Sequence, residues 1–219
     1  TLERHLKAHY ETYLTPKSTP LTRVDDVLLL SPKRVAPAIL APQLTMQDLP
    51  SPGLVIPTSR VGVPNGGVRF MNGDTLLARI TPCLENGKTG YVSQLGDDEV
   101  GFGSTEYIVM RSREGLPLPL SYFIATDERF RSQAMLRMVG SSGRQRVKAS
   151  DLADLTISMT DDKNVLAQFG EIAESHVALA GSLNDESRTL AELRDTLLPA
   201  LMDGTIKVKD AVASAEEVL

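Results

Sequence analysis

A repeat of apolar residues near the C-terminal end constrains this chain more than any other feature. Alternating steps of four and three residues from Val165 to Leu197 give ten positions, of which only His176 and Glu186 are polar. Steps of this kind keep one face of an α-helix apolar, as in coiled coils. The pattern predicts one long amphipathic helix over residues 163–198, about 54 Å long at 1.5 Å per residue.

Both ends of this predicted helix carry boundary signals. Asp161 and Asp162 suit the N-terminal end, which is the positive end of the helix dipole. Pro199 and Gly204 are typical of residues at which a helix ends. We therefore assign residues 161–204 to one long spacer or dimerisation helix of the coiled-coil type.

The apolar stripe of such a helix needs a covering surface. A globular body built from the preceding residues has a diameter of about 30 Å, which is less than the helix length. The helix-compatible segment at residues 2–14 is too short to cover the stripe, so we expect a partner chain or self-association, with His176 fixing the pairing register. The alternative is a helix that folds back over its own domain. The expected contact residues are Phe169, Ile172, His176, Leu179, Leu183, Leu190, Leu193 and Leu197.

The residues before the long helix alternate between strand-like and helix-like patterns. Short runs rich in Val and Ile are separated by turns rich in Asn, Gly and Pro, and residues 119–138 then switch to helical spacing. A Gly-rich loop at residues 140–143, a short helix capped by Ser150 and a last strand at residues 155–157 follow. The other candidate strands are residues 53–56, 75–80, 91–94 and 106–110.

These patterns predict an α+β protein, in which a mixed α/β globular domain with mainly antiparallel strands precedes the long helix. The predicted division is an N-terminal helix and linker at 1–20, the globular domain at 21–160, the long helix at 161–204 and a tail at 205–219. No run is apolar enough for a membrane span or a signal peptide, and the single cysteine, Cys83, excludes an internal disulfide. We expect a soluble, cytoplasmic protein.

The net charge of −5 hides two parts of opposite sign. Residues 1–150 hold 18 Lys and Arg against 14 Asp and Glu, whereas residues 151–219 hold 5 against 14. Inside the first part, the run from Arg129 to Lys148 carries six basic side chains and no acidic one. Such a run can neutralise DNA phosphates, although a solvated helix face explains the charge alone equally well.

Motifs of catalysis and metal binding are weak. Gly87-Lys88-Thr89 resembles the end of a phosphate-binding loop, but Pro82 stands where that loop requires its first glycine. His5 and His9 have the spacing of metal ligands, without the glutamate of a zinc protease or an evident third ligand. No Ser-His-Asp set or nucleophile elbow can be proposed. We therefore expect no catalytic activity, no metal and no cofactor.

Two polar and basic segments remain as candidates for binding. The first follows the Gly-rich loop, where arginine can pair with guanine and glutamine with adenine through double hydrogen bonds. The second borders a predicted strand and a turn between residues 79 and 88. A surface patch of salt bridges is the alternative for any one of these residues. The candidate DNA-binding residues are Arg79, Thr81, Asn86, Lys88, Ser141, Ser142, Arg144, Gln145, Arg146 and Lys148.

Four blocks of the sequence follow one another at residues 72–88, 101–109, 140–147 and 193–204. Taken together and in this order, they resemble blocks of the specificity subunits of type I restriction-modification systems. One departure is the segment 161–168, which lacks the proline-rich lead usual in that family and keeps little besides Gln168. The resemblance spans residues 21–208, and four ordered blocks are far more specific than one.

The resemblance implies one target-recognition domain and one conserved spacer helix, which together make half of a full-length subunit. Such a subunit recognises double-stranded DNA at a bipartite target, while methyltransferase and restriction subunits supply methyl transfer and cleavage. A half-subunit is expected to form a homodimer through the long helix and to bind an inverted repeat. The alternative is a coiled-coil scaffold that docks a methyltransferase or another partner without touching DNA. A stand-alone metal-dependent nuclease is a third hypothesis, which the spacing of the acidic residues does not favour.

Overall fold

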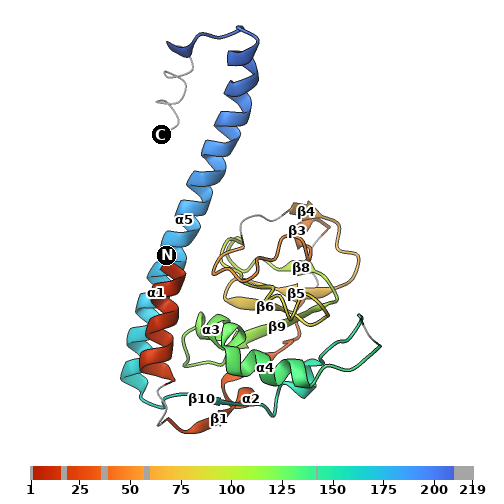
Figure 1. The fold of residues 1–219 in the computed structure, drawn as a ribbon, viewed down its shortest axis with the longest axis vertical. Helices are drawn as coiled ribbons and strands as arrows, with labels where there is room; N and C mark the ends of the chain where they lie inside the picture. The colour runs from red at the N-terminus through yellow and green to blue at the C-terminus, as the bar shows by residue number, and fades with distance from the viewer. Residues whose placement is uncertain (1, 16–18, 36–38, 57–59, 142, 210–219) are drawn as a thin grey trace. The chain divides into compact units, whose positions relative to one another are not determined.

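A computed structural model describes residues 2–15, 19–35, 39–56, 60–141 and 143–209 of the chain. The chain divides into two compact units, Thr1–Ala180 and Gly181–Leu219. The first unit contains all the strands of the described residues (Figure 1). The described part of the second unit consists of the C-terminal half of helix α5 (Lys163–Met202) and the short segment that follows it.

The strands of the first unit form three sheets. The central sheet has the order β2-β9-β6-β7 and is antiparallel throughout. The second sheet has the order β4-β3-β8-β5, in which only the pair β3 and β8 is parallel, and β1 pairs with β10. The prediction of mainly antiparallel strands is therefore confirmed. The strands are β1 (Leu21–Arg23), β2 (Leu28–Leu30), β3 (Ala41–Leu44), β4 (Arg60–Gly62), β5 (Val68–Phe70), β6 (Asp74–Ala78), β7 (Thr89–Tyr91), β8 (Gly101–Gly103), β9 (Tyr107–Ser112) and β10 (Thr156–Ser158).

The neighbouring strands β6 and β9 separate two hydrophobic cores. Successive side chains of a strand point to opposite faces of its sheet. On one face, the paired residues Leu77 and Ile108 join the larger core, which includes the helices. On the other face, the paired residues Leu76 and Val109 join a smaller core shared with the second sheet. Because both faces are covered, this sheet is a rigid support for the loops at its ends.

Two helices form in the stretch at residues 119–138, for which the sequence predicted helical spacing. Helix α3 (Leu120–Thr126) and helix α4 (Glu128–Leu136) are separated by Asp127, whose backbone is extended. The Asp127 carboxylate accepts hydrogen bonds from the backbone N–H groups of Arg129 and Phe130, so it is the N-cap of α4. This capping residue therefore divides the helical stretch into α3 and α4.

The other helical elements are short. Residues 2–14 are helical as predicted, first as an α-helix and then as a π-helix. The prediction that Ser150 caps a helix is wrong, because Ser150 lies inside a 3₁₀ turn and its hydroxyl contacts the Asp151 carboxylate. These elements are α1 (Leu2–His9), the π-helix η1 (Tyr10–Leu14), α2 (Val24–Val27) and the 3₁₀ turn η2 (Ala149–Asp151).

The N-terminal helical segment covers the first part of α5. The ring of Tyr10 lies 6.3 Å from that of Phe169, and His5 stacks on His176 with their ring centroids 5.9 Å apart. Phe169 is only 1% exposed, and Figure 1 shows α1 alongside this part of α5. The expectation that the whole stripe needs another chain is therefore wrong for this part, because α1 and η1 continue along it as one helical segment.

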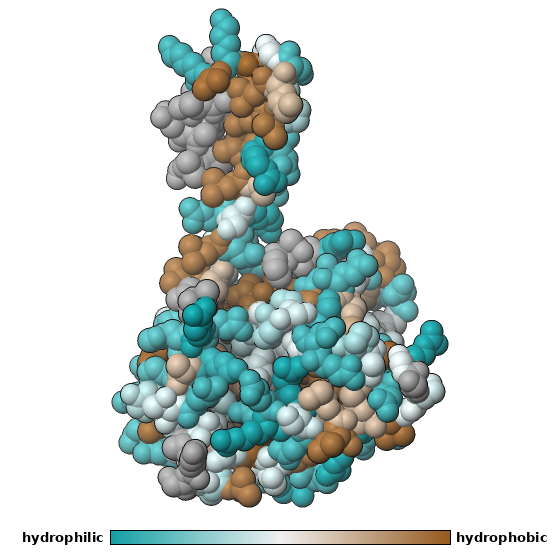
Figure 2. Space-filling model, in the orientation of Figure 1, coloured by the Kyte–Doolittle hydropathy of each residue, from teal (hydrophilic) through white to brown (hydrophobic). Residues whose placement is uncertain are grey.

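The apolar stripe of the second unit stays exposed. Leu183 is 46% exposed and Leu190 41%, and Figure 2 shows hydrophobic side chains gathered along this segment. Helix α5 continues through Pro199 to Met202, a little beyond the predicted end. None of the helices in the described residues is both long and apolar enough to cross a membrane.

Most of the predicted strands are present, with shifted ends. The runs predicted at 75–80, 106–110 and 155–157 correspond to β6, β9 and β10, and the run at 91–94 overlaps β7 only at Tyr91. The strand predicted at 53–56 is wrong: Gly53 forms an isolated bridge to Gly90, and its neighbours are buried without pairing. Burial of apolar side chains, not strand pairing, produced that pattern.

Candidate nucleic-acid interface

The two candidate binding segments lie side by side in the first unit. Ile80 and Arg146 form an antiparallel bridge. The backbone N–H of Thr81 donates to the carbonyl of Gln145 over 3.0 Å, and that of Val147 donates to the carbonyl of Arg79 over 3.0 Å. The polar groups of residues 79–88 and those that follow the Gly-rich loop therefore belong to one surface.

The Gly-rich segment is a hairpin anchored at its base. Val139 and Arg146 exchange two backbone hydrogen bonds of 2.9 Å, and Gly140 between them has a φ of +140°, which favours glycine. Val147 is fully buried. Because side chains alternate along extended backbone, Arg146 and Lys148 point away from the core on either side of Val147. The hairpin extends beyond α4 at the right of Figure 1.

The turn at residues 84–87, before β7, is fixed by contacts with helix α4. Leu84 is fully buried, and Arg131 of α4 donates to the carbonyl oxygens of Leu84 and Glu85 over 2.9 and 3.0 Å. Gly87 has a φ of +74°, and a Cβ there would lie 3.2 Å from the Arg131 guanidinium. Asn86 is exposed, and its side chain makes no hydrogen bond within the described residues. The turn therefore presents a free amide from a fixed backbone.

Several predicted residues are available to a ligand. Arg144 and Lys148 are exposed, and Gln145 is half-buried. Their side chains make no hydrogen bond or ion pair in the part of the chain that the structure describes. Ser141 is also exposed, whereas Ser142 lies outside the described residues. These groups supply two cations and several hydrogen-bonding groups on the hairpin.

Two other predicted residues, Lys88 and Thr81, are less accessible to a ligand. The ammonium of Lys88 donates to the carbonyl oxygens of Met46 and Leu49 over 2.7 and 3.2 Å. The hydroxyl of Thr81 is buried and has no hydrogen-bond partner among the described residues. Both residues are half-buried. A contact from either residue to DNA stays a prediction.

Sequence reasoning missed Glu106, which lies between the two candidate segments. Its carboxylate accepts from Arg146 Nε over 2.9 Å and from Arg79 Nε over 3.3 Å. Hydrogen bonds from Arg146, and then from Arg79, hold the pKa of the Glu106 carboxyl below its ordinary value. The available signal was the position of Glu106 just before a strand inside the block 101–109.

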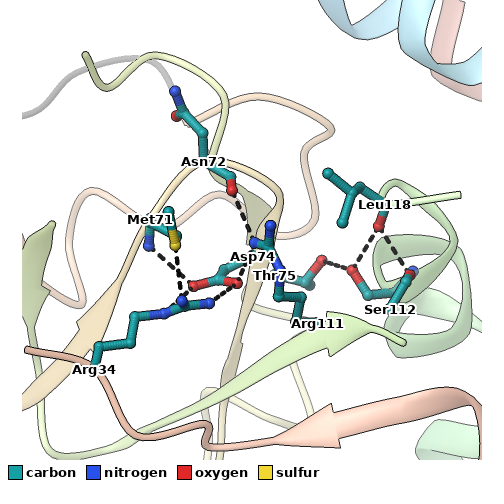
Figure 3. A network of polar contacts seen from close by, with 9 residues as sticks. Arg34, Met71, Asn72, Asp74, Thr75, Arg111, Ser112 and Leu118 are labelled. Atoms are coloured by element: carbon teal, nitrogen blue, oxygen red, sulfur yellow. Dashed lines mark hydrogen bonds and ion pairs between the residues drawn. The ribbon is translucent and has the colours of Figure 1, made fainter. Parts of the chain in front are cut away.

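A second set of ionic groups surrounds the buried Asp74, where the inner strand β6 of the central sheet begins (Figure 3). Asp74 is fully buried and accepts from Arg34 Nη2 over 2.5 Å and from Arg111 Nη1 over 2.9 Å. The backbone N–H of Met71 donates to the same carboxylate, and Arg111 also donates to the carbonyl of Asn72. These contacts fix the turn that begins β6.

The three histidines of the chain also come together. His5 lies 6.1 Å from His9 and 5.9 Å from His176, measured between ring centroids. The rings of His5 and His176 are stacked nearly parallel, and His176 Nδ1 is 2.8 Å from the carbonyl oxygen of Ile172. Within the described residues, no group of three or more His, Cys, Asp or Glu is arranged to hold a metal ion.

Comparison with known proteins supports the resemblance predicted from the sequence. The specificity subunit of the type I restriction enzyme EcoEI of Escherichia coli is 31% identical over 150 residues, which are 64% of this chain and 24% of that protein. The EcoAI specificity subunit of Escherichia coli is 27% identical over 149 residues, which are 66% of this chain and 24% of that protein. The match thus spans about a quarter of the length of these relatives. No family model matches the chain.

Solved structures of type I specificity subunits overlap this chain only weakly. The HsdS subunit from Thermoanaerobacter tengcongensis has a TM-score of 0.49 at 14% identity, covering 91% of this chain and 50% of that one. The type I S subunit from M. genitalium has a TM-score of 0.47 at 14% identity, covering 82% and 44%. Because these scores lie below 0.5, the resemblance predicted from the four blocks is confirmed by the sequence relatives and not by these overlaps.

Proposed function

We propose that this chain, a relative of the type I restriction enzyme specificity subunits, recognises double-stranded DNA through the surface formed by residues 79–88 and 139–148. The observation that carries the proposal is the pairing of Ile80 with Arg146, which joins the two basic segments. On this proposal, residues 21–160 are the target-recognition domain. The chain directs methyltransferase and restriction subunits to a bipartite target in the cytoplasm and has no catalytic activity of its own.

The chemistry of this surface suits DNA. Exposed cations such as Arg144 and Lys148 supply the attraction to phosphates, which dominates affinity and depends on salt. Side-chain amides such as those of Asn86 and Gln145, and guanidiniums such as that of Arg144, are the groups that read base edges in the major groove. A fixed turn and a hairpin anchored by Val147 hold these groups in place, which lowers the entropy lost on binding.

Charge reversal on the hairpin tests the proposal. The variant Arg144→Glu/Arg146→Glu is expected to bind mixed-sequence duplex DNA at least about tenfold more weakly than the wild type, with a shallower dependence on salt. A matched control is Arg188→Glu/Arg194→Glu, which changes the charge by the same amount on the exposed surface of α5.

The same comparison separates recognition from scaffolding. Loss of DNA binding by the hairpin variant alone, with an unchanged oligomeric state, supports recognition. Equal DNA binding by the wild type and both variants would contradict it and favour the scaffold that docks a methyltransferase. Cleavage of DNA by the purified chain with Mg²⁺ and no other subunit would instead favour a nuclease.

We propose further that two copies pair through the exposed part of α5. Leu183 and Leu190 are each more than two-fifths exposed on one stripe, and Leu193 and Leu197 lie on the same stripe. Apolar stripes of this kind are stable in water when a second helix covers them. A homodimer with two-fold symmetry would present two identical recognition domains to an inverted repeat.

The solution mass of the chain tests this pairing. We expect light scattering to give the mass of a dimer for the wild type and of a monomer for Leu183→Glu/Leu190→Glu. Leu136→Glu is the control, since Leu136 is 85% exposed and lies on α4, outside the stripe. A monomeric wild type would contradict the homodimer and with it the symmetric target, while leaving the proposal of DNA binding open to its own test.

A further inference from the structure

Glu106 forms ion pairs with Arg79 and Arg146 where the two proposed DNA-binding segments meet. Glu106 directly precedes β9, and Arg79 directly follows β6, the strand that pairs with β9. The backbone N–H of Arg79 donates to the carbonyl of Glu106 over 3.0 Å, so the two residues are fixed to each other at the main chain. Arg146 reaches the same carboxylate from the hairpin.

The contacts orient the two guanidinium groups differently. Arg146 uses Nε and Nη2 on the Glu106 carboxylate, with an N···O distance of 2.8 Å from Nη2, and Nη1 donates to the Arg144 carbonyl. Arg79 uses only Nε, over 3.3 Å. Its two terminal amino groups make no hydrogen bond within the described residues, although together they are the fork that pairs with O6 and N7 of guanine.

The cluster is accessible to a ligand. The side chains of Glu106, Arg79 and Arg146 are 23%, 30% and 41% exposed. Two guanidinium groups against one carboxylate leave a net positive charge at this site. The carboxylate is ionised at neutral pH, because hydrogen bonds from both arginines favour its charged form and lower its pKa.

We propose that Glu106 is a positioning residue that sets sequence discrimination: it holds the Arg79 and Arg146 guanidiniums in one orientation and weakens their unselective attraction to DNA phosphates. The inference rests on the proposed function, since it assigns a role within the same DNA-binding surface. Phosphate contacts give affinity without sequence information, whereas a fixed guanidinium fork discriminates between bases. Glu106 shifts the balance toward discrimination.

Removal of the Glu106 charge is therefore expected to raise the affinity for DNA of any sequence and to lower the preference for one sequence. The variant Glu106→Gln adds one unit of positive charge to the surface, which strengthens binding to DNA of any sequence. The freed arginines lose their common orientation, which weakens the preference for one sequence. A residue that only supported the fold would instead lower both affinity and preference when changed.

The experiment uses the full chain and a pool of duplexes whose central base pairs are randomised. For Glu106→Gln, we expect roughly twofold to fivefold tighter binding to the unselected pool. We also expect roughly a fivefold to hundredfold smaller preference for the sequence that the wild type enriches from it. Glu114→Gln is the matched control, because Glu114 is an exposed glutamate in the turn after β9 and its change alters the net charge equally.

A second pair of variants tests the two arginines directly. Arg79→Gln and Arg146→Gln are each expected to lower pool affinity and preference together, because each removes a cation and a reading group. If Glu106→Gln enriches the same sequence as strongly as the wild type, or if its pool affinity and preference both fall, the positioning role is wrong and the proposed function stands. If the wild type neither binds the pool nor enriches a sequence, the proposed function itself is wrong.

Discussion

Two carboxylates in this fold each hold two arginines, but they differ in how far water reaches them. The Asp74 side chain is fully buried, and its partners Arg34 and Arg111 are 12% and 22% exposed. The Glu106 side chain is 23% exposed, and the guanidiniums around it are more exposed still. The same set of ionic groups therefore occurs once inside the fold and once on its surface.

Each cluster holds one arginine whose guanidinium nitrogens are all used and one whose nitrogens are not. All three nitrogens of the Arg34 guanidinium make contacts, two with Asp74 and one with the sulfur of Met71. Around Glu106, the fork of Arg79 keeps both terminal amino groups without a partner in the described residues. In the buried cluster Arg111 likewise donates only through Nη1 within the described residues, so unused donors occur in both clusters, and the cluster that water reaches is the one that can bind a ligand.

The largest expected effect is on stability at the buried cluster. Asp74→Asn removes the charge that compensates two buried guanidiniums, so the free energy of unfolding is expected to fall by about 3–5 kcal/mol. Chemical denaturation measures this change. Asp97→Asn, at an exposed aspartate in the loop before β8, serves as the control. A loss of less than about 1 kcal/mol at Asp74 would mean that the buried cluster contributes no more than a surface ion pair.

The next effect separates the two clusters by DNA binding. Arg79→Gln is expected to make the salt dependence of duplex binding shallower, by at most about 0.9 in the slope of log K against log salt, because one cation facing the DNA is lost. Arg111→Gln is expected to leave the affinity of the folded fraction unchanged, since that guanidinium points to Asp74. Equal effects of both variants on the slope would contradict the division between the clusters.

A smaller effect concerns the stability that the surface cluster provides. Glu106→Gln is expected to change the free energy of unfolding by at most about 1 kcal/mol, because water screens exposed ion pairs. High salt is expected to abolish this difference and to leave the effect of Asp74→Asn in place, since buried pairs are screened much less. Denaturation of both variants at low and high salt makes the comparison.

The smallest expected effect is a dependence on pH. Because the pKa of Glu106 is lower in the folded protein than in the unfolded chain, its contribution to stability is complete above the unfolded value of about 4.3. The contribution is lost as the pH falls through the folded value. The melting temperatures of the wild type and Glu106→Gln should therefore differ most at neutral pH and converge in acid. A gap that widens in acid would reverse the assigned direction of the pKa shift.

The long helix was the part of the fold that the sequence predicted best. Heptad spacing depends on the residues of one helix alone, and α5 begins where Asp162 caps it, with its carboxylate accepting from the backbone N–H of Asn164. The spacing could not show what covers the stripe. Phe169 and Leu190 follow the same repeat, yet one is buried under η1 and the other is exposed. Coverage depends on segments distant in sequence.

The candidate site was predicted in pieces. Each segment was recognisable from its own residues, such as the basic triplet that ends in Arg146. The bridge from Ile80 to Arg146 was not, because it forms only when the hairpin after α4 returns to the end of β6. Glu106 was missed for the same reason: its importance comes from two arginines that are each far from it along the chain.

Short strands were the least predictable elements. Strands of three residues, such as β4 and β5, give too few positions for an alternating pattern to be recognised. The parallel pairing of β3 with β8 likewise has no local signal, since its partners are more than fifty residues apart.

The central claim is that this chain recognises DNA sequence, and selection from a randomised duplex pool by the wild-type chain tests it most directly. The account predicts binding that weakens as salt rises from about 50 to 200 mM. It also predicts enrichment of one sequence, which is an inverted repeat if the chain dimerises through α5. A recovered pool with the same base composition as the starting pool at every position would contradict the claim.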